Sequence, residues 1–133
     1  MSVLTRTGLA FAAVAALVVP TVTGLSAGTA MANAPCGSSA PGDHDDSSWN
    51  ATGNNSRMRS GTNAASTTNC AIKSTARPGD RLDYHCYTRG NDGYTWTYLR
   101  NDTRSPDTYG WVRDDVLSDG GSFVECPEYP IPG

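Results

Sequence analysis

The sequence predicts a small all-β barrel of five to six short strands with one short helical turn, stapled by disulfide bonds. Residues 35–133 hold only nine Leu, Ile, Val and Phe residues, but also nine Trp and Tyr residues. Short runs rich in aromatic and β-branched residues alternate with Gly, Pro, Asn and Asp, a pattern typical of strands and turns. All four cysteines lie in this part of the chain, and an even number in an exported chain indicates disulfides.

Residues 1–34 are typical of a cleaved secretory signal peptide. Arg6 supplies the positive charge, and residues 9–19 form the apolar segment. Cleavage is expected after Ala34 or after Ala32, because both end a small-x-small pattern. Eleven apolar residues make about 16 Å of helix, which is too short for the ~30 Å core of a bilayer. We therefore expect a secreted, extracellular protein that contacts no membrane after cleavage and that could associate with the cell wall.

The first half of the exported chain is expected to be irregular before it becomes β-structure. Residues 35–55 are dominated by Gly, Ser, Asn, Asp and Pro and predict an irregular N-terminal arm, docked through Trp49. Residues 56–126 predict the barrel. Its first two strands are expected at 56–60 and 70–74, on either side of a polar loop.

The second half contains the clearest strand patterns. Residues 81–88 follow a Pro-Gly turn and alternate Leu82, Tyr84 and Cys86 with polar positions, the period of a half-buried strand. Aromatic and β-branched residues predict further strands at 94–100 and 109–113, and a closing strand is expected at 122–125. A helical turn is expected at 114–117, and the chain is expected to end in a flexible Pro-rich tail at 127–133.

Five short motifs occur in an order that resembles the bacterial SH3-like (SH3b) domain, in its small secreted, disulfide-containing actinobacterial form. They are Arg59-Ser60-Gly61, the turn at 77–82, Trp96-Thr97-Tyr98-Leu99, Gly110-Trp111-Val112 and Asp115-Val116-Leu117. The resemblance covers about residues 56–118 and implies an SH3-like barrel that binds cell-wall peptidoglycan. The chain departs from the family at Arg57, where Asn is usual, and at Ala76, where an aliphatic residue is common.

The cysteine spacing favours disulfides over a metal site. The gaps of 34, 16 and 40 residues contain no closely spaced ligand pair. Three pairings are possible, and we expect Cys70–Cys86 nested inside Cys36–Cys126. On the chain-entropy argument the inner loop contributes about 3 kcal/mol and the outer loop about 4 kcal/mol.

The sequence contains no recognisable catalytic motif, so we expect a protein that is not an enzyme and needs no cofactor. His85 is expected to be an exposed strand residue. His44 lies in the run 43–46, Asp-His-Asp-Asp, which is either a weak cation site or, more simply, a solvated acidic loop. The net charge of −4 over residues 35–133 excludes a basic nucleic-acid-binding domain. We also expect the protein to be a monomer.

Aromatic residues are the best candidates for ligand binding. Trp96 and Tyr98 share one face of their strand, opposite Leu99, so they are expected to look outward if Leu99 is a core residue. The alternative is that the tryptophans are the largest packing residues of the barrel. The candidate ligand-binding residues are Trp96, Tyr98, Tyr94, Tyr84 and Trp111.

The expected function is therefore that of a secreted, non-catalytic binding module. The aromatic surface would recognise cell-wall peptidoglycan or an extracellular peptide. The alternative is a small disulfide-stapled effector or inhibitor that uses its loops against an extracellular enzyme.

Overall fold

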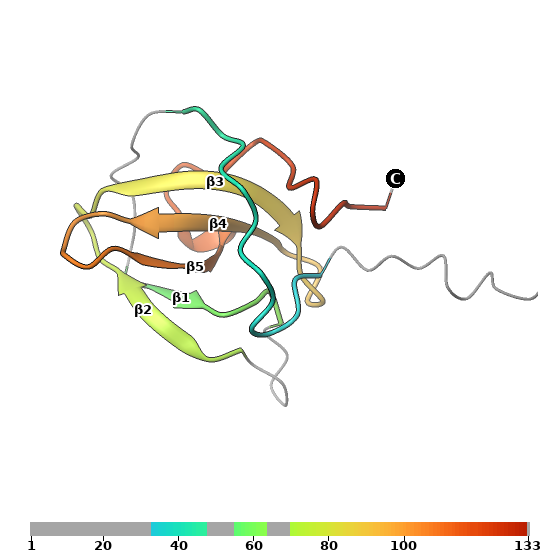
Figure 1. The fold of residues 1–133 in the computed structure, drawn as a ribbon, viewed down its shortest axis with the longest axis horizontal. Helices are drawn as coiled ribbons and strands as arrows, with labels where there is room; N and C mark the ends of the chain where they lie inside the picture. Colours follow the sequence, from blue (N-terminus) through green and yellow to red (C-terminus); the bar gives the residue numbers. More distant parts are fainter. Residues whose placement is uncertain (1–32, 48–54, 64–69, 133) are drawn as a thin grey trace, which may run out of the picture.

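The computed structural model describes residues 33–47, 55–63 and 70–132. The expected docking of Trp49 and nearly all of the expected signal peptide lie outside these residues. The described chain forms one five-stranded antiparallel sheet with the order β2-β1-β5-β4-β3 (Figure 1). Its elements are β1 (Ser56–Arg59), β2 (Ile72–Ala76), β3 (Leu82–Arg89), β4 (Thr95–Asn101), β5 (Thr108–Arg113) and the 3-10 turn η2 (Asp114–Val116).

The prediction of an all-β, disulfide-stapled fold is confirmed, but the prediction of a closed barrel is wrong. β2 and β3 lie at opposite ends of the sheet and do not pair with each other. The outer edge of β3 is instead occupied by other parts of the same chain. Tyr87 N donates to Val124 O at 2.7 Å, and Cys126 N donates to Tyr87 O at 2.8 Å. These bonds occupy part of the β3 edge that would pair with β2 in a closed barrel.

The predicted strands are largely confirmed, with shifts of one or two residues at their ends. The second strand begins and ends two residues later than expected, and the helical turn is the 3-10 turn η2. The closing strand at 122–125 is wrong in extent, because only an isolated parallel bridge joins Tyr87 to Glu125. The polar segment before it turns at two consecutive glycines with positive φ, Gly120 and Gly121, a conformation that a strand does not adopt.

The two faces of the sheet build two separate hydrophobic clusters. Side chains alternate between the faces of a strand, so neighbours in the sequence pack in different clusters. The first cluster contains Met58, Ala76, Leu82, Tyr84, Leu99, Val112 and Leu117. The second contains Ala34, Cys86, Trp96, Tyr98, Trp111 and Cys126, with Tyr129 packed against it.

A β-bulge corrects the expected alternation along β3. The register with β4 shifts between Tyr84 and Cys86, so that His85 is the extra residue. Tyr84 therefore packs in the first cluster while Cys86 packs in the second. A bulge places two residues opposite one and changes which face the following side chains occupy, whereas the simple period of two had put Leu82, Tyr84 and Cys86 on one face.

The expected disulfide pairing is also wrong: the bonds are Cys36–Cys70 and Cys86–Cys126. Because the bulge turns Cys86 toward the second face and residues 124–126 pair with the edge of β3, Cys126 lies only 5.0 Å from Cys86 between Cα atoms. Cys70 precedes β2 at the other side of the sheet, where the arm passes. Topology, rather than the shortest loop, therefore decides the pairing.

Candidate functional site

The structure does not bring the five aromatic candidates together on one exposed surface. Trp96, Tyr98 and Trp111 lie on the second face of the sheet and are 7% exposed or less. Tyr84 is buried on the opposite face, where its hydroxyl donates to Asp119. Of the five, only Tyr94 is strongly exposed, at 47%. The expectation that Trp96 and Tyr98 face the solvent is therefore wrong.

The arm and the C-terminal segment bury these aromatic rings. In Figure 1 the arm crosses the sheet from the side of β1 to β3, and the C-terminal segment runs beside β3. Ala34 and Tyr129 pack against the second cluster, and the Tyr129 ring meets the Trp111 ring edge-on at 5.8 Å. Residues 35–47, the described part of the predicted arm, contain no helix or strand, and their irregular composition contains no signal for the face that they cover.

Two adjacent hollows remain open beside β1, and Trp96, Tyr98 and Trp111 form part of their walls. Each hollow has a volume of about 340 Å³, and Arg59 lines both of them. The first is lined by Asn55, Ser56, Arg57, Arg59, Trp96, Arg113 and Val116. The second is lined by Gly37, Ser38, Ala40, Arg59, Ser60, Lys73, Tyr98, Gly110 and Trp111. We call the two hollows together the basic groove.

Four cationic side chains give the basic groove its charge: Arg57, Arg59, Lys73 and Arg113. Arg113 is partly neutralised, because it makes a bidentate contact of 2.6–2.7 Å to Asp115 and lies 3.8 Å from Asp92. Within the described part of the chain, the other three cations make no ion pair with a carboxylate. The chain as a whole carries −3, so this positive groove is a local feature that favours anions.

Sequence reasoning missed these cations, although a signal for them was present. Arg57 and Arg59 are two residues apart in a predicted strand and so share a face. In the registers, Arg59 lies opposite Trp111, and Trp111 lies opposite Tyr98. Three of the five aromatic candidates, Trp96, Tyr98 and Trp111, line the groove. The cations that give the groove its charge come from β1, β2 and β5.

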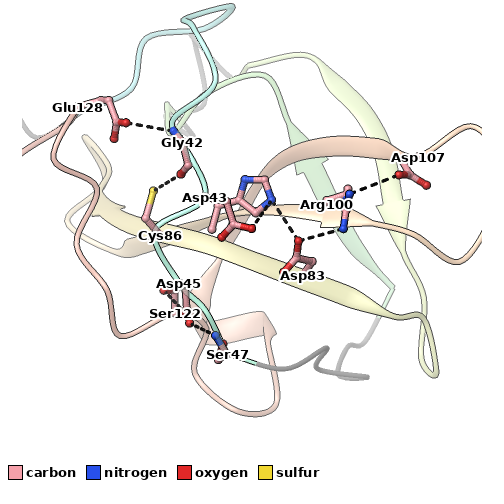
Figure 2. A network of polar contacts seen from close by, with 11 residues as sticks. Gly42, Asp43, Asp45, Ser47, Asp83, Cys86, Arg100, Asp107, Ser122 and Glu128 are labelled. Carbon is pink, nitrogen blue, oxygen red and sulfur yellow. Dashed lines mark hydrogen bonds and ion pairs between the residues drawn. The ribbon is translucent and has the colours of Figure 1, made fainter.

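A group of ionisable side chains joins the arm to β3 and β4 (Figure 2). His85 Nε2 lies 3.4 Å from Asp83 Oδ2 and 3.9 Å from Asp43 Oδ2. Arg100 Nη2 lies 3.3 Å from the same Asp83 oxygen, and Arg100 Nη1 lies 3.9 Å from Asp107. Burial, followed by the charge of Asp43, raises the pKa of Asp83. The expectation that His85 is exposed is wrong, since it is only 9% exposed.

The residues Asp43, Asp83 and His85 could offer three ligand atoms to a metal ion, all within 4.8 Å of one another. Two features argue against that use. Arg100 already contacts Asp83 Oδ2, the carboxylate oxygen that also lies near His85. Within the described part of the chain, the buried His85 Nδ1 has no hydrogen-bond partner. A histidine ligand normally donates its second ring N–H to an oriented acceptor. We therefore assign this cluster to arm docking.

His44 belongs to the same docking system. Its Nε2 lies 2.8 Å from Glu128 Oε1, while its backbone N donates to His85 O. The neighbouring Asp45 accepts a hydrogen bond of 2.7 Å from Ser122 Oγ. Asp43, His44 and Asp45 of the run at 43–46 are therefore structural in this fold: they fasten the arm to β3 and to the C-terminal segment.

Among the residues that the structure describes, no helix is long and apolar enough to cross a membrane. Comparison with protein-family models, with curated proteins and with solved structures finds no match to this chain.

Proposed function

We propose that this protein is a secreted, non-catalytic binding module of the SH3-like type that holds an anionic extracellular ligand in the basic groove. The ligand we favour is cell-wall peptidoglycan, whose stem peptides carry carboxylates. The observation that carries the proposal is the groove itself: about 340 Å³ in each hollow, aromatic rings in the wall, and three cations without a carboxylate partner among the described residues. Arginine side chains suit carboxylates because the guanidinium presents a fork of donors.

The charge distribution supports the same ligand class. Two acidic side chains of the arm, Asp43 and Asp45, contact His85 and Ser122 on the β3 side, away from the groove. The β1 side therefore keeps its positive charge in a chain whose total charge is negative. A neutral or cationic ligand would gain nothing from this separation, whereas an anion is attracted to one side only.

The test is a pull-down on purified peptidoglycan with the wild type and two charge-reversal variants. Arg57→Glu should weaken binding about five- to tenfold, because it reverses one groove cation. Arg89→Glu makes the same change in net charge outside the groove and should bind like the wild type. Trp96→Ala is a poorer choice, since that side chain is only 2% exposed and its loss would disturb packing. Absence of wild-type binding would remove the wall ligand, and equal binding by Arg57→Glu would remove the groove.

Secretion is part of the proposal, and the packing at residues 33 and 34 favours one of the two cleavage positions. The two disulfides fit an oxidising, extracellular environment. Ala34 is fully buried. Its N donates a hydrogen bond of 3.0 Å to Thr62 Oγ1, and its O accepts one of 2.9 Å from Thr62 N. Thr62 Oγ1 also donates to Asn33 Oδ1. Cleavage after Ala34 would remove these contacts, so we expect cleavage after Ala32, which the intact mass of the exported protein will show.

A further inference from the structure

The two edges of the sheet are treated differently by the rest of the chain. The outer edge of β3 is covered by backbone hydrogen bonds from residues 124–126 and from His44. For the outer edge of β2, no backbone partner is found among the described residues. An uncovered edge strand presents N–H and C=O groups that can pair with another extended chain.

We propose that the outer edge of β2 takes an extended acidic peptide of a partner protein as a sixth strand. The inference rests on the proposed function in one respect, namely that the basic groove attracts anions. It goes further in naming a peptide as the ligand and main-chain pairing as the mode of binding. Acidic side chains of the added strand would lie beside Lys73, which lines the second hollow.

Backbone direction identifies the position at which the added strand can pair. Ser60 N donates to Ala71 O, so Ser60 faces β2. The backbone N–H and C=O groups of successive residues point to alternate sides of a strand. The backbone groups of Met58 therefore also point toward β2, and those of Arg57 point away from it. Thr75 lies opposite Arg57 in the register. Opposite residues in an antiparallel pair both face inward or both face outward, which turns the N–H of Thr75 toward the open edge.

The side chains of β2 suit an added strand. Ile72 is 50% exposed and Lys73 is exposed, and the strand contains no proline. Lys73 is the extra residue where the register with β1 shifts, and it lines the second hollow of the groove. An incoming strand would therefore meet an apolar contact and a cation at the same end of β2.

Charge decides between an acidic partner and a second copy of this chain. β1, β2 and the residue that follows β2 contribute four cations, Arg57, Arg59, Lys73 and Arg77, and no acidic residue. Pairing β2 with β2 of another copy would bring these like charges together, which is unfavourable across neighbouring strands. An acidic peptide brings the opposite charge to the same positions.

The experiment measures binding of a synthetic peptide of alternating glutamate and valine by fluorescence anisotropy, with a lysine-valine peptide as the comparison. The wild type should bind the glutamate peptide and not the lysine peptide. Thr75→Pro removes the outward N–H and should weaken binding at least about tenfold. Thr75→Val keeps both the N–H and the branched side chain, and should bind like the wild type. Circular dichroism checks that both variants fold.

A second variant leaves the backbone unchanged, so the proposal remains testable if Thr75→Pro does not fold. Lys73→Glu should weaken binding of the glutamate peptide several-fold and increase binding of the lysine peptide. Failure of the wild type to bind the glutamate peptide overturns the inference, as does wild-type affinity in Thr75→Pro. If Arg57→Glu still weakens peptidoglycan binding in either case, the proposed function stands without the added strand. A wild-type dimer in sedimentation that Thr75→Pro abolishes would overturn the choice of an acidic partner.

Discussion

Replacing Asp114 by asparagine should make the protein more stable near neutral pH, and the gain should disappear in acid. Asp114 begins η2 and is 8% exposed. Its Oδ1 accepts a hydrogen bond of 2.6 Å from Thr97 Oγ1, and that hydroxyl accepts one of 2.8 Å from Ser122 N. Burial raises the pKa of Asp114 from 3.8 to about 6, although the hydrogen bond from Thr97 opposes the change. An asparagine keeps an acceptor oxygen for Thr97 without the buried charge.

The magnitude follows from the difference in proton affinity between the folded and the unfolded chain. A tenfold difference corresponds to about 1.4 kcal/mol, so a pKa of about 6 in place of 3.8 corresponds to about 3 kcal/mol. Because the folded pKa is raised, the stabilising contribution of protonated Asp114 is present below pH 3.8 and is lost as the pH rises through about 6. The asparagine variant does not undergo this loss.

The assay is urea unfolding of the wild type and Asp114→Asn near pH 4 and near pH 7.5, with the disulfides intact. The difference in unfolding free energy between the two proteins should grow by at least about 2 kcal/mol from the lower to the higher pH. Any fixed cost of the substitution cancels in this comparison. Asp115→Asn is the matched control: Arg113 lowers the pKa of Asp115, which is exposed, so its effect should be small and of opposite sign. A difference for Asp114→Asn that does not change with pH would refute the reasoning.

Three other changes test the packing of the fold by chemical denaturation. Gly121→Ala should lower the free energy of unfolding by more than about 3 kcal/mol, because the new Cβ would overlap two buried oxygens and φ is +81°. Gly79→Ala, where φ is +83° but the surrounding space is open, should lower it by only about 1–2 kcal/mol. Replacing Cys86 and Cys126 by alanine should cost about 4 kcal/mol or more, since their bond closes a loop of 40 residues, and peptide mapping without reduction should recover that bond. Tyr84→Phe removes a 2.8 Å hydrogen bond and should cost about 1 kcal/mol.

The sequence was most informative where a strand has regular alternation on both faces. Along β4, Trp96 and Tyr98 do share one face and Leu99 is buried on the other, as the period of two requires. Along β3 the same rule fails after Tyr84, because an inserted residue leaves no mark in the pattern of polar and apolar residues. That single bulge accounts for the wrong face of Cys86, and through it for the wrong disulfide pairing.

The candidate site was only half predictable for a related reason. Composition identifies aromatic residues that a small core cannot easily hold, but it does not say what else can cover them. Here the arm and the C-terminal segment do so, through contacts between residues more than 80 positions apart, such as His44 with Glu128. The spacing of Arg57 and Arg59 places both on one face of β1, but only the registers bring Arg59 opposite Trp111 and beside the arm.

The arm has two consequences for binding, and they cannot be separated by removing it. It covers the aromatic rings of the second cluster, yet its residues Ser38 and Ala40 also form a wall of the second hollow. A chain without the arm would expose more aromatic surface and still lack that wall. Greater aromatic exposure should therefore not increase binding if the groove is the site. Substitutions that keep the arm in place and change only charge, such as Arg57→Glu, are for this reason the informative ones.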